Sequence, residues 1–200
     1  MGQPKKFRPM LWLFILLLLG IFLLIYMIGN SRWWKRKQYP MAYEDQIRKY
    51  ASEYEVDPFL VVSVIWVESR FIPTAVSSKD ARGLMQILPS TGEWVAEKIG
   101  LSGYSDEQLF EPEINIQIGC WYLGYLTSQF PDSRKLVLAS YNGGIGNVNK
   151  WLSNKEYSPD GKQLDHIPFA ETRSYVKKVT SVYEIYKEIY PSWKSRTIDE

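Results

Sequence analysis

The chain has 200 residues, enough for one ordinary domain with an appendage, and its formal net charge is +2. Seven of the 24 basic residues and no acidic residue lie within positions 1–40, which leaves 17 basic against 22 acidic residues in the remainder. An acidic main part argues against nucleic acid as the partner, and one cysteine with one histidine cannot form a disulfide or a Cys/His zinc site.

The first predicted element is an apolar segment that runs from Met10 to Ile28 without a charged or amide side chain. At about 1.5 Å per helical residue it is long enough to cross a hydrocarbon core of roughly 30 Å. Trp33 and Trp34 follow it, where amphipathic rings favour the membrane boundary. The predicted organisation is a basic tail over 1–9, a transmembrane helix over 10–29, a basic stalk over 30–40 and a folded domain over 41–200.

Two alternatives to this membrane anchor are weaker. A buried core helix rarely has so long an uninterrupted apolar run. A cleaved signal peptide fits the basic start at Lys5, Lys6 and Arg8, but the run exceeds a usual h-region and no small-x-small cleavage site follows. Basic residues flank the segment on both sides, so charge alone does not orient it, and we expect them to contact anionic lipid headgroups.

Helical periodicity dominates the sequence from residue 41 onward, so the predicted fold class is mainly α. Candidate N-caps are Asp57 before Pro58, Ser90 with Glu93 in capping-box spacing, and Asp132. No segment alternates strictly, although a small hairpin would fit 71–82 or 154–168. The predicted helices are 47–54, 58–70, 89–100, 114–125, 134–143 and 171–190.

Two inward faces are predicted from this periodicity, one on the helix over 114–125 and one on the last helix. The first is marked by Ile114, Ile118, Trp121, Tyr122 and Tyr125. The second is marked by Tyr175, Val179, Val182, Tyr186 and Ile189.

Glu68 is the strongest catalytic candidate by position. It ends the second predicted helix, on the same face as Leu60 and Val64. Burial and the negative end of the helix dipole both disfavour its ionised form, which raises the pKa as a general acid near neutral pH requires. Arg70 would oppose this rise only by turning inward, which its i, i+2 placement disfavours. The alternative is a surface glutamate at a helix end.

Four sequence blocks then follow in a fixed order, beginning with ESRFIPTAVS at Glu68 and GLMQILPST at Gly83. The third is ASYNGGIG, from Ala139, and the fourth is IPFAETRSYV, from Ile167. Together they resemble the lytic transglycosylase catalytic domain of glycoside hydrolase family 23, which has a lysozyme-like fold. Asp80-Ala81 stand where that family usually has Gly-Ala, and a glycine lost there bears on the local turn.

The resemblance implies a role for each matching residue. Glu68 matches the catalytic acid. Ser77 and Gln86 match residues that bind the sugar beside the scissile bond, and Tyr141 and Asn142 match a pair that lines the cleft. No metal or cofactor is implied.

Several of these residues, and two others, have a purely structural alternative. Glu171 matches a second acid facing the cleft, but the helix dipole also favours an acid in a first turn. Ser77 is also placed to cap the segment that follows it, and Tyr141 to pack in the core with a satisfied hydroxyl. Cys120 is expected to be a small buried hydrophobe and His166 a loop residue.

The activity implied by the resemblance is peptidoglycan cleavage between N-acetylmuramic acid and N-acetylglucosamine, with formation of 1,6-anhydromuramyl ends. Two alternatives stay open: hydrolysis, as in goose-type lysozymes, and a non-catalytic wall-binding scaffold. The expected partners are peptidoglycan glycan strands and the lipid bilayer, the latter through residues 10–29. Because peptidoglycan lies outside the cell membrane, the tail over 1–9 is expected in the cytoplasm and the domain on the outer side.

Overall fold

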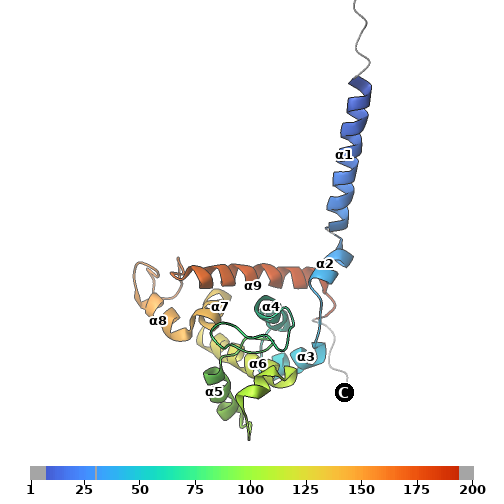
Figure 1. Cartoon of the computed structure of the whole chain (residues 1–200). Helices are drawn as coiled ribbons and strands as arrows, with labels where there is room; N and C mark the ends of the chain where they lie inside the picture. Colours follow the sequence, from blue (N-terminus) through green and yellow to red (C-terminus); the bar gives the residue numbers. More distant parts are fainter. Residues whose placement is uncertain (1–7, 30, 194–200) are drawn as a thin grey trace, which may run out of the picture. The chain divides into compact units, whose positions relative to one another are not determined.

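The computed structural model describes residues 8–29 and 31–193, and helices are the regular elements of this part (Figure 1). The chain divides after Pro40 into two compact units, each of which is described by itself. The elements in chain order are α1 (Arg8–Gly29), α2 (Arg32–Gln38), α3 (Glu44–Glu53), α4 (Pro58–Glu68), α5 (Pro89–Ile99), the 3₁₀ helix η1 (Asp106–Phe110), α6 (Pro112–Gln129), α7 (Arg134–Gly143), α8 (Ile145–Ser153) and α9 (Ala170–Ile189).

The first unit consists of α1 and α2. The predicted span over 10–29 lies within α1, which by length and composition is able to cross a membrane, and its stretch Met10–Met27 is unburied. The basic tail over 1–9 lies outside the described residues except for the first two positions of α1. The stalk over 30–40 contains the short helix α2, where the Lys37 ammonium lies 4.0 Å from the centre of the Trp33 ring.

In the second unit α4 is the central helix. Every residue from Phe59 to Trp66 is buried, as expected of a helix that is apolar on all sides. It packs against α3 and α9 (Figure 1). The predicted cap is confirmed, because the Asp57 carboxylate accepts the Phe59 N–H at 2.9 Å. The predicted end at residue 70 is wrong by two positions, since the backbone turns left-handed at Arg70 and Phe71.

The capping box predicted at the start of α5 is wrong. Pro89 occupies the first helical position, which leaves Leu88 as the N-cap without a side-chain hydrogen bond. Ser90 and Glu93 therefore lie inside the helix rather than at its boundary. The predicted end at Gly100 is confirmed by its left-handed backbone, with φ of 70°.

The cap of α7 differs from prediction by one residue, and the short helix η1 was not predicted. The Ser133 hydroxyl caps α7 by accepting the Leu136 N–H at 3.3 Å, so Asp132 is not the cap. Ser105 and Gln108 form a capping box around η1, an element too short to show periodicity. Adjacent polar residues are equally suited to capping, and only the backbone conformation distinguishes them.

The predicted inward face of α6 is only partly correct. Ile118 is fully buried, but the aromatic residues of that face are half-exposed and form a ring cluster with Trp94. Trp121 and Tyr125 lie parallel in this cluster, with ring centres 5.7 Å apart. The buried residues of α6 are Asn115, Ile116, Ile118, Gly119, Cys120, Leu123 and Leu126.

Within the described residues after 143 the structure contains one α-helix that the sequence did not predict. The helix α7 stops at Gly143 as expected, but α8 follows after Gly144 instead of a loop. Residues 154–168 form turns, and the other proposed hairpin is reduced to isolated bridges from Arg82 to Val76 and to Ile87.

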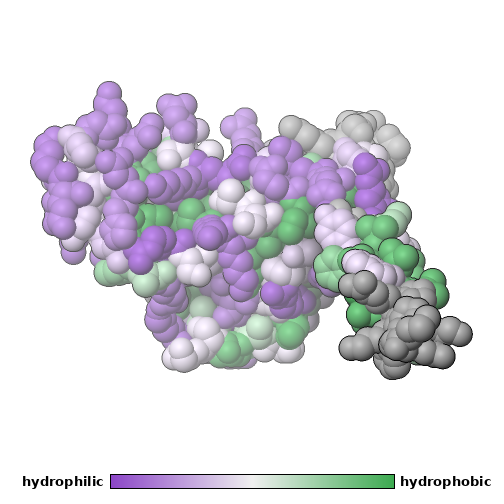
Figure 2. Space-filling model, turned by 90° about the horizontal axis from the view of Figure 1, so that it is seen from above, coloured by the Kyte–Doolittle hydropathy of each residue, from purple (hydrophilic) through white to green (hydrophobic). Residues whose placement is uncertain are grey.

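The last helix, α9, separates polar and apolar residues as predicted. The buried residues Tyr175, Val179, Val182, Tyr186 and Ile189 lie on its inner side. Figure 2 shows the face of the domain on which α9 lies, and hydrophilic residues prevail there. The exposed polar residues of α9 include Glu171, Arg173, Ser174, Lys177, Lys178, Ser181, Glu184 and Lys187.

Candidate active site

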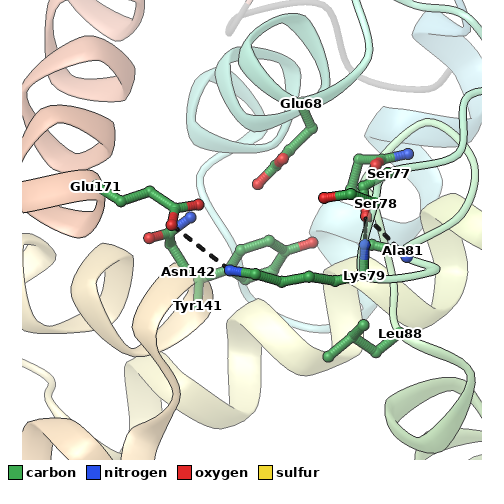
Figure 3. A pocket seen from close by; sticks show the side chains of 10 residues that line it. Glu68, Ser77, Ser78, Lys79, Ala81, Leu88, Tyr141, Asn142 and Glu171 are labelled. Carbon is green, nitrogen blue, oxygen red and sulfur yellow. Dashed lines mark hydrogen bonds and ion pairs between the residues drawn. The ribbon is translucent and has the colours of Figure 1, made fainter. Parts of the chain in front are cut away.

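A cavity of about 200 Å³ brings together the six residues expected at the site. The end of α4 contributes Glu68, the loop after it contributes Ser77 and Gln86, α7 contributes Tyr141 and Asn142, and α9 contributes Glu171. Their side chains converge from these four segments (Figure 3). Four further lining residues are Ser78, Lys79, Ala81 and Leu88.

Glu68 has a strongly shifted pKa, raised from 4.5 to about 7. Burial of the carboxyl group is the main cause, because removal from water disfavours the charged form. The Tyr175 hydroxyl and the Lys178 ammonium lower this pKa, and the Glu171 carboxylate raises it. The net result is a carboxylic acid that still holds its proton close to neutral pH.

The residues after Glu68 fix the end of α4. The buried Ser69 hydroxyl donates to the Leu84 carbonyl at 2.8 Å and so joins the helix end to the loop. Arg70 is directed away from the acid, since its guanidinium lies 3.1 Å from the centre of the Trp66 ring.

In the loop, Ser77 is both a turn residue and a cavity residue. Its hydroxyl accepts the N–H groups of Lys79 at 3.2 Å and Ala81 at 3.0 Å, so the capping alternative is correct. The hydroxyl proton remains available to a ligand in the cavity.

The side chain of Gln86 is fixed by two hydrogen bonds to the backbone of the loop. Its amide nitrogen donates to the carbonyls of Ala75 at 3.1 Å and Gly83 at 3.0 Å. Both amide protons are therefore used within the loop, and Gln86 offers its side-chain oxygen to the cavity as an acceptor.

A buried asparagine that the sequence did not single out supports this loop. The Asn115 side chain accepts from Met85 N–H at 2.8 Å and donates to the carbonyls of Arg82 at 3.0 Å and Leu109 at 2.7 Å. Gly83 makes room for it, because a Cβ there would overlap Asn115 and the Leu109 carbonyl, and its φ of 74° also requires glycine.

On the opposite side, Tyr141 packs in the core as well as lining the cavity. Its hydroxyl donates to the Met85 carbonyl at 2.8 Å, its ring lies 5.5 Å from that of Tyr122, and burial raises its pKa well above 10. Neighbouring Asn142 is half-buried, and its side-chain amide has no partner within the part of the chain that the structure describes.

Glu171 differs from Glu68 in its environment. It lies in the first turn of α9, as the structural alternative expected, and also lines the cavity. Its carboxylate pairs with the Lys79 ammonium at 3.5 Å, and their side chains are 73% and 74% exposed. The cavity therefore holds one buried carboxyl group and one that is solvated and ion-paired.

Tyr175 is a site residue that sequence analysis placed only in the core. It lies one turn after Glu171 in α9, and its buried hydroxyl is close enough to the Glu68 carboxylate to lower the pKa of that acid. Among the described residues the hydroxyl makes no hydrogen bond of ordinary geometry. Tyr175 follows Glu171 at i, i+4 spacing, which puts the two residues on neighbouring positions of one helix face. That spacing is the sequence signal by which Tyr175 could have been found.

The single cysteine and the single histidine of the chain lie where the sequence predicted. Cys120 is buried with a free thiol, and His166 is exposed in a loop beside Arg173. Within residues 8–29 and 31–193 no group of three or more histidine, cysteine or carboxylate side chains is placed to hold a metal ion.

Comparison with known proteins identifies the family. The family model "Transglycosylase SLT domain" matches residues 45–164, more than half of the chain. The chain belongs to the transglycosylase SLT domain family. The matched range includes Glu68, Ser77, Gln86, Tyr141 and Asn142, whereas Glu171 follows it.

Relatives with curated names include soluble and membrane-bound proteins. The soluble lytic murein transglycosylase of Escherichia coli K12 is 35% identical over 174 residues, covering 78% of this chain and 27% of that protein. The membrane-bound lytic murein transglycosylase C of Sodalis glossinidius is 34% identical over 166 residues, covering 72% and 46%. The chain thus spans about a quarter to a half of the length of these SLT-domain relatives.

A solved structure supports the same fold. The crystal structure of the 70-kDa soluble lytic transglycosylase of Escherichia coli matches with a TM-score of 0.69 and 34% identity, over 81% of this chain and 27% of that one. The mainly helical domain therefore has the lytic transglycosylase fold, as its sequence blocks predicted.

The departure from the family's Gly-Ala pattern has a structural explanation. Asp80 has a left-handed backbone, with φ of 61°, which aspartate tolerates better than most residues. Its carboxylate accepts from two nitrogens of Arg82, at 3.0 and 3.1 Å. Asp80 therefore occupies a left-handed turn position without being glycine, and Arg82 binds its carboxylate.

Proposed function

We propose that this chain is a peptidoglycan lytic transglycosylase, anchored in the cell membrane, that uses Glu68 as both acid and base. The observation that carries the proposal is the position of Glu68 in the cavity with a pKa of about 7. A group with this pKa donates a proton efficiently near neutral pH and accepts it back in the next step.

In the proposed reaction Glu68 protonates the oxygen that links N-acetylmuramic acid to N-acetylglucosamine. The bond from that oxygen to C1 of the muramyl residue breaks, and the acetamido oxygen of the substrate supports the positive charge at C1. The muramyl C6 hydroxyl then attacks C1, and its proton returns to the Glu68 carboxylate. The products are an N-acetylglucosamine end and a 1,6-anhydromuramyl end, with no water consumed.

The other cavity residues would hold the sugar. Ser77 has a hydroxyl proton to donate, Gln86 offers an oxygen as acceptor and Asn142 offers a complete amide. Tyr141 fixes the wall of the cavity and presents its oxygen as an acceptor, because its O–H donates to the Met85 backbone carbonyl. Such fixed groups orient the C6 hydroxyl toward C1 without reorganisation.

The state of Glu171 favours this reaction over hydrolysis. Glycosidases that add water generally use two carboxylates in the site, one of them as base or nucleophile. Here the second carboxylate is solvated and paired with Lys79, so it lacks the burial of Glu68. A mechanism with one catalytic carboxyl group fits this asymmetry.

Analysis of the fragments released from purified cell wall tests the proposal. The full chain in detergent should release muropeptides with 1,6-anhydro ends, and Glu68→Gln should slow release by about 100-fold or more, because a positioned acid contributes at least that factor. Reducing muramyl ends would establish hydrolysis instead. Wall binding without release, equal in both proteins, would establish a non-catalytic scaffold.

We also propose that α1 spans the membrane once, with the tail in the cytoplasm and the domain over 41–200 on the outer side. The apolar composition of α1 and the names of the membrane-bound relatives support membrane association. The orientation follows from where peptidoglycan lies. Protease added to intact spheroplasts should therefore digest the domain, and protection of the domain would overturn both the orientation and the activity.

A further inference from the structure

Lys79 is the one cation among the described residues that line the cavity; the other charged lining residues are Glu68 and Glu171. Figure 3 shows its side chain reaching across the cavity from the loop toward Glu171 on α9, where the ion pair forms. The motif match assigns no role to this position, which lies between Ser77 and Gln86 in the sequence.

The backbone beneath Lys79 is fixed, whereas its side chain is not. The Ser77 hydroxyl accepts the Lys79 N–H, and the carboxylate of the next residue, Asp80, accepts from two nitrogens of Arg82. Beyond this turn the Lys79 side chain is 74% exposed, and its contact with Glu171 is long, at 3.5 Å. Exposed ion pairs contribute about 0–1 kcal/mol, so another anion readily replaces Glu171.

A peptidoglycan strand supplies such an anion. N-acetylmuramic acid bears a lactyl group at C3, whose carboxylate is free in strands without peptide, and stem peptides carry carboxylates of their own. We propose that Lys79 binds a carboxylate of the glycan strand in the cavity, exchanging Glu171 for the substrate, and so makes the site selective for muramyl over neutral sugars. This inference rests on the proposed function and names the group by which substrate is recognised.

Binding by the full chain in detergent tests the exchange, in a Glu68→Gln background so that no ligand is cut. Four tetrasaccharides serve as probes: one with free lactyl carboxylates, the same one with those carboxylates capped as methylamides, one with intact stem peptides, and chitotetraose. Lys79→Met should weaken binding of a carboxylate-bearing probe by about tenfold, a loss of roughly 1.4 kcal/mol. Binding of the methylamide probe and of chitotetraose should not change.

Two further variants separate charge from structure. Lys79→Arg keeps the charge and should keep most of the affinity for the carboxylate-bearing probe. Lys98→Met removes an exposed lysine from α5 that does not line the cavity, and should leave every affinity unchanged. Loss with the free lactyl probe identifies the lactyl carboxylate as the partner, and loss only with the peptide-bearing probe identifies the stem.

Two results would overturn the inference. Equal affinities of Lys79→Met and its parent for all four probes would mean that the lysine binds no substrate carboxylate. Equal weakening with charged and neutral probes would mean a structural effect. In either case the wall digestion by protein with intact Glu68 would still stand. The proposed function itself would be refuted if protein with intact Glu68 released no fragment and the Glu68→Gln parent bound no glycan.

Discussion

Glu68 shows how far a single side chain depends on its surroundings. Burial raises its pKa, the negative charge of Glu171 adds to that rise, and the Tyr175 hydroxyl and the Lys178 ammonium oppose it. Two of these neighbours are on the exposed side of α9 and one is buried within it. The residues of α9 thus tune an acid that belongs to α4.

The pH dependence of wall cleavage should reveal this tuning. Because the reaction starts from protonated Glu68, the rate should fall as the pH rises through about 7. Glu171→Gln removes a charge that raises the pKa and should move this descending limb to lower pH. Lys178→Met removes a charge that lowers the pKa and should move it to higher pH. Shifts of both variants in one direction would contradict this account.

Stability should respond to the same acid. The folded state raises the pKa of Glu68 from 4.5 to about 7, so the protonated group stabilises the fold below pH 4.5 and this contribution is lost as the pH rises to 7. Glu68→Gln has no such loss. It should unfold at a higher temperature than the parent at pH 8, by an amount equivalent to at most about 3–4 kcal/mol, and show little difference at pH 4. A difference independent of pH would exclude burial of the charge as its cause.

At the residue scale the sequence predicted much of the site and omitted what depends on packing. The ordered blocks identified six residues that one cavity brings together. Tyr175 was assigned only to the core, because periodicity cannot tell a buried hydroxyl beside an acid from one that merely packs. Lys79 was not singled out either, since its contact with Glu171 joins residues 92 positions apart.

Among the elements, α6 supports the site indirectly. Its buried Asn115 makes three hydrogen bonds to the backbone of the loop and of η1, and so fixes Met85, whose carbonyl holds Tyr141. A polar residue on a buried face gives no periodic signal, which explains why the sequence did not reveal it. The same helix shows that aromatic residues at helical spacing need not be the buried ones.

Replacing Asn115 tests this support. Asn115→Ala leaves one buried N–H and two carbonyls without their partner, so it should lower the free energy of unfolding by about 3 kcal/mol or more. Gln117→Ala, on the same helix, is the matched control: it loses one half-buried hydrogen bond to Tyr54 at 3.3 Å and should cost less than about 1 kcal/mol. Urea unfolding measures both, and equal losses would mean that Asn115 has no special role.

The boundaries of the helices were predicted correctly only where the local sequence fixes the backbone. Asp57 was predicted correctly because Pro58 fixes the start of its helix. Ser90 was wrong because Pro89 occupies the first helical position and makes apolar Leu88 the N-cap. Asp132 was wrong because Ser133 beside it is equally suited to capping, and local sequence does not choose between them. The helix α8 was missed since glycines that stop one helix also permit the next to begin at a new angle.

For the whole molecule, the division after Pro40 separates the proposed wall-cutting domain from its proposed anchor. Covalent length limits the distance between them. In the proposed topology the seven residues of α2 extend about 10 Å, and four further residues of chain span at most about 14 Å. The covalent link would therefore let the domain begin no more than about 25 Å from the membrane surface. In the proposed topology the anchor would restrict the wall that the active site reaches, a property that no single residue determines.

The same protein in two environments should show this restriction. Full chain reconstituted in liposomes and full chain in detergent should cut short soluble glycan strands at similar rates per exposed domain, because small substrates diffuse to the cavity. Intact sacculi should be cut several-fold more slowly by the reconstituted protein, since a particle cannot bring most of its strands within about 25 Å of a bilayer. A flexible Gly/Ser insertion of about 20 residues after Pro40 should restore much of the rate, as it adds roughly 25 Å of average reach. Equal rates on sacculi in both environments, or no effect of the insertion, would show that the anchor does not limit reach.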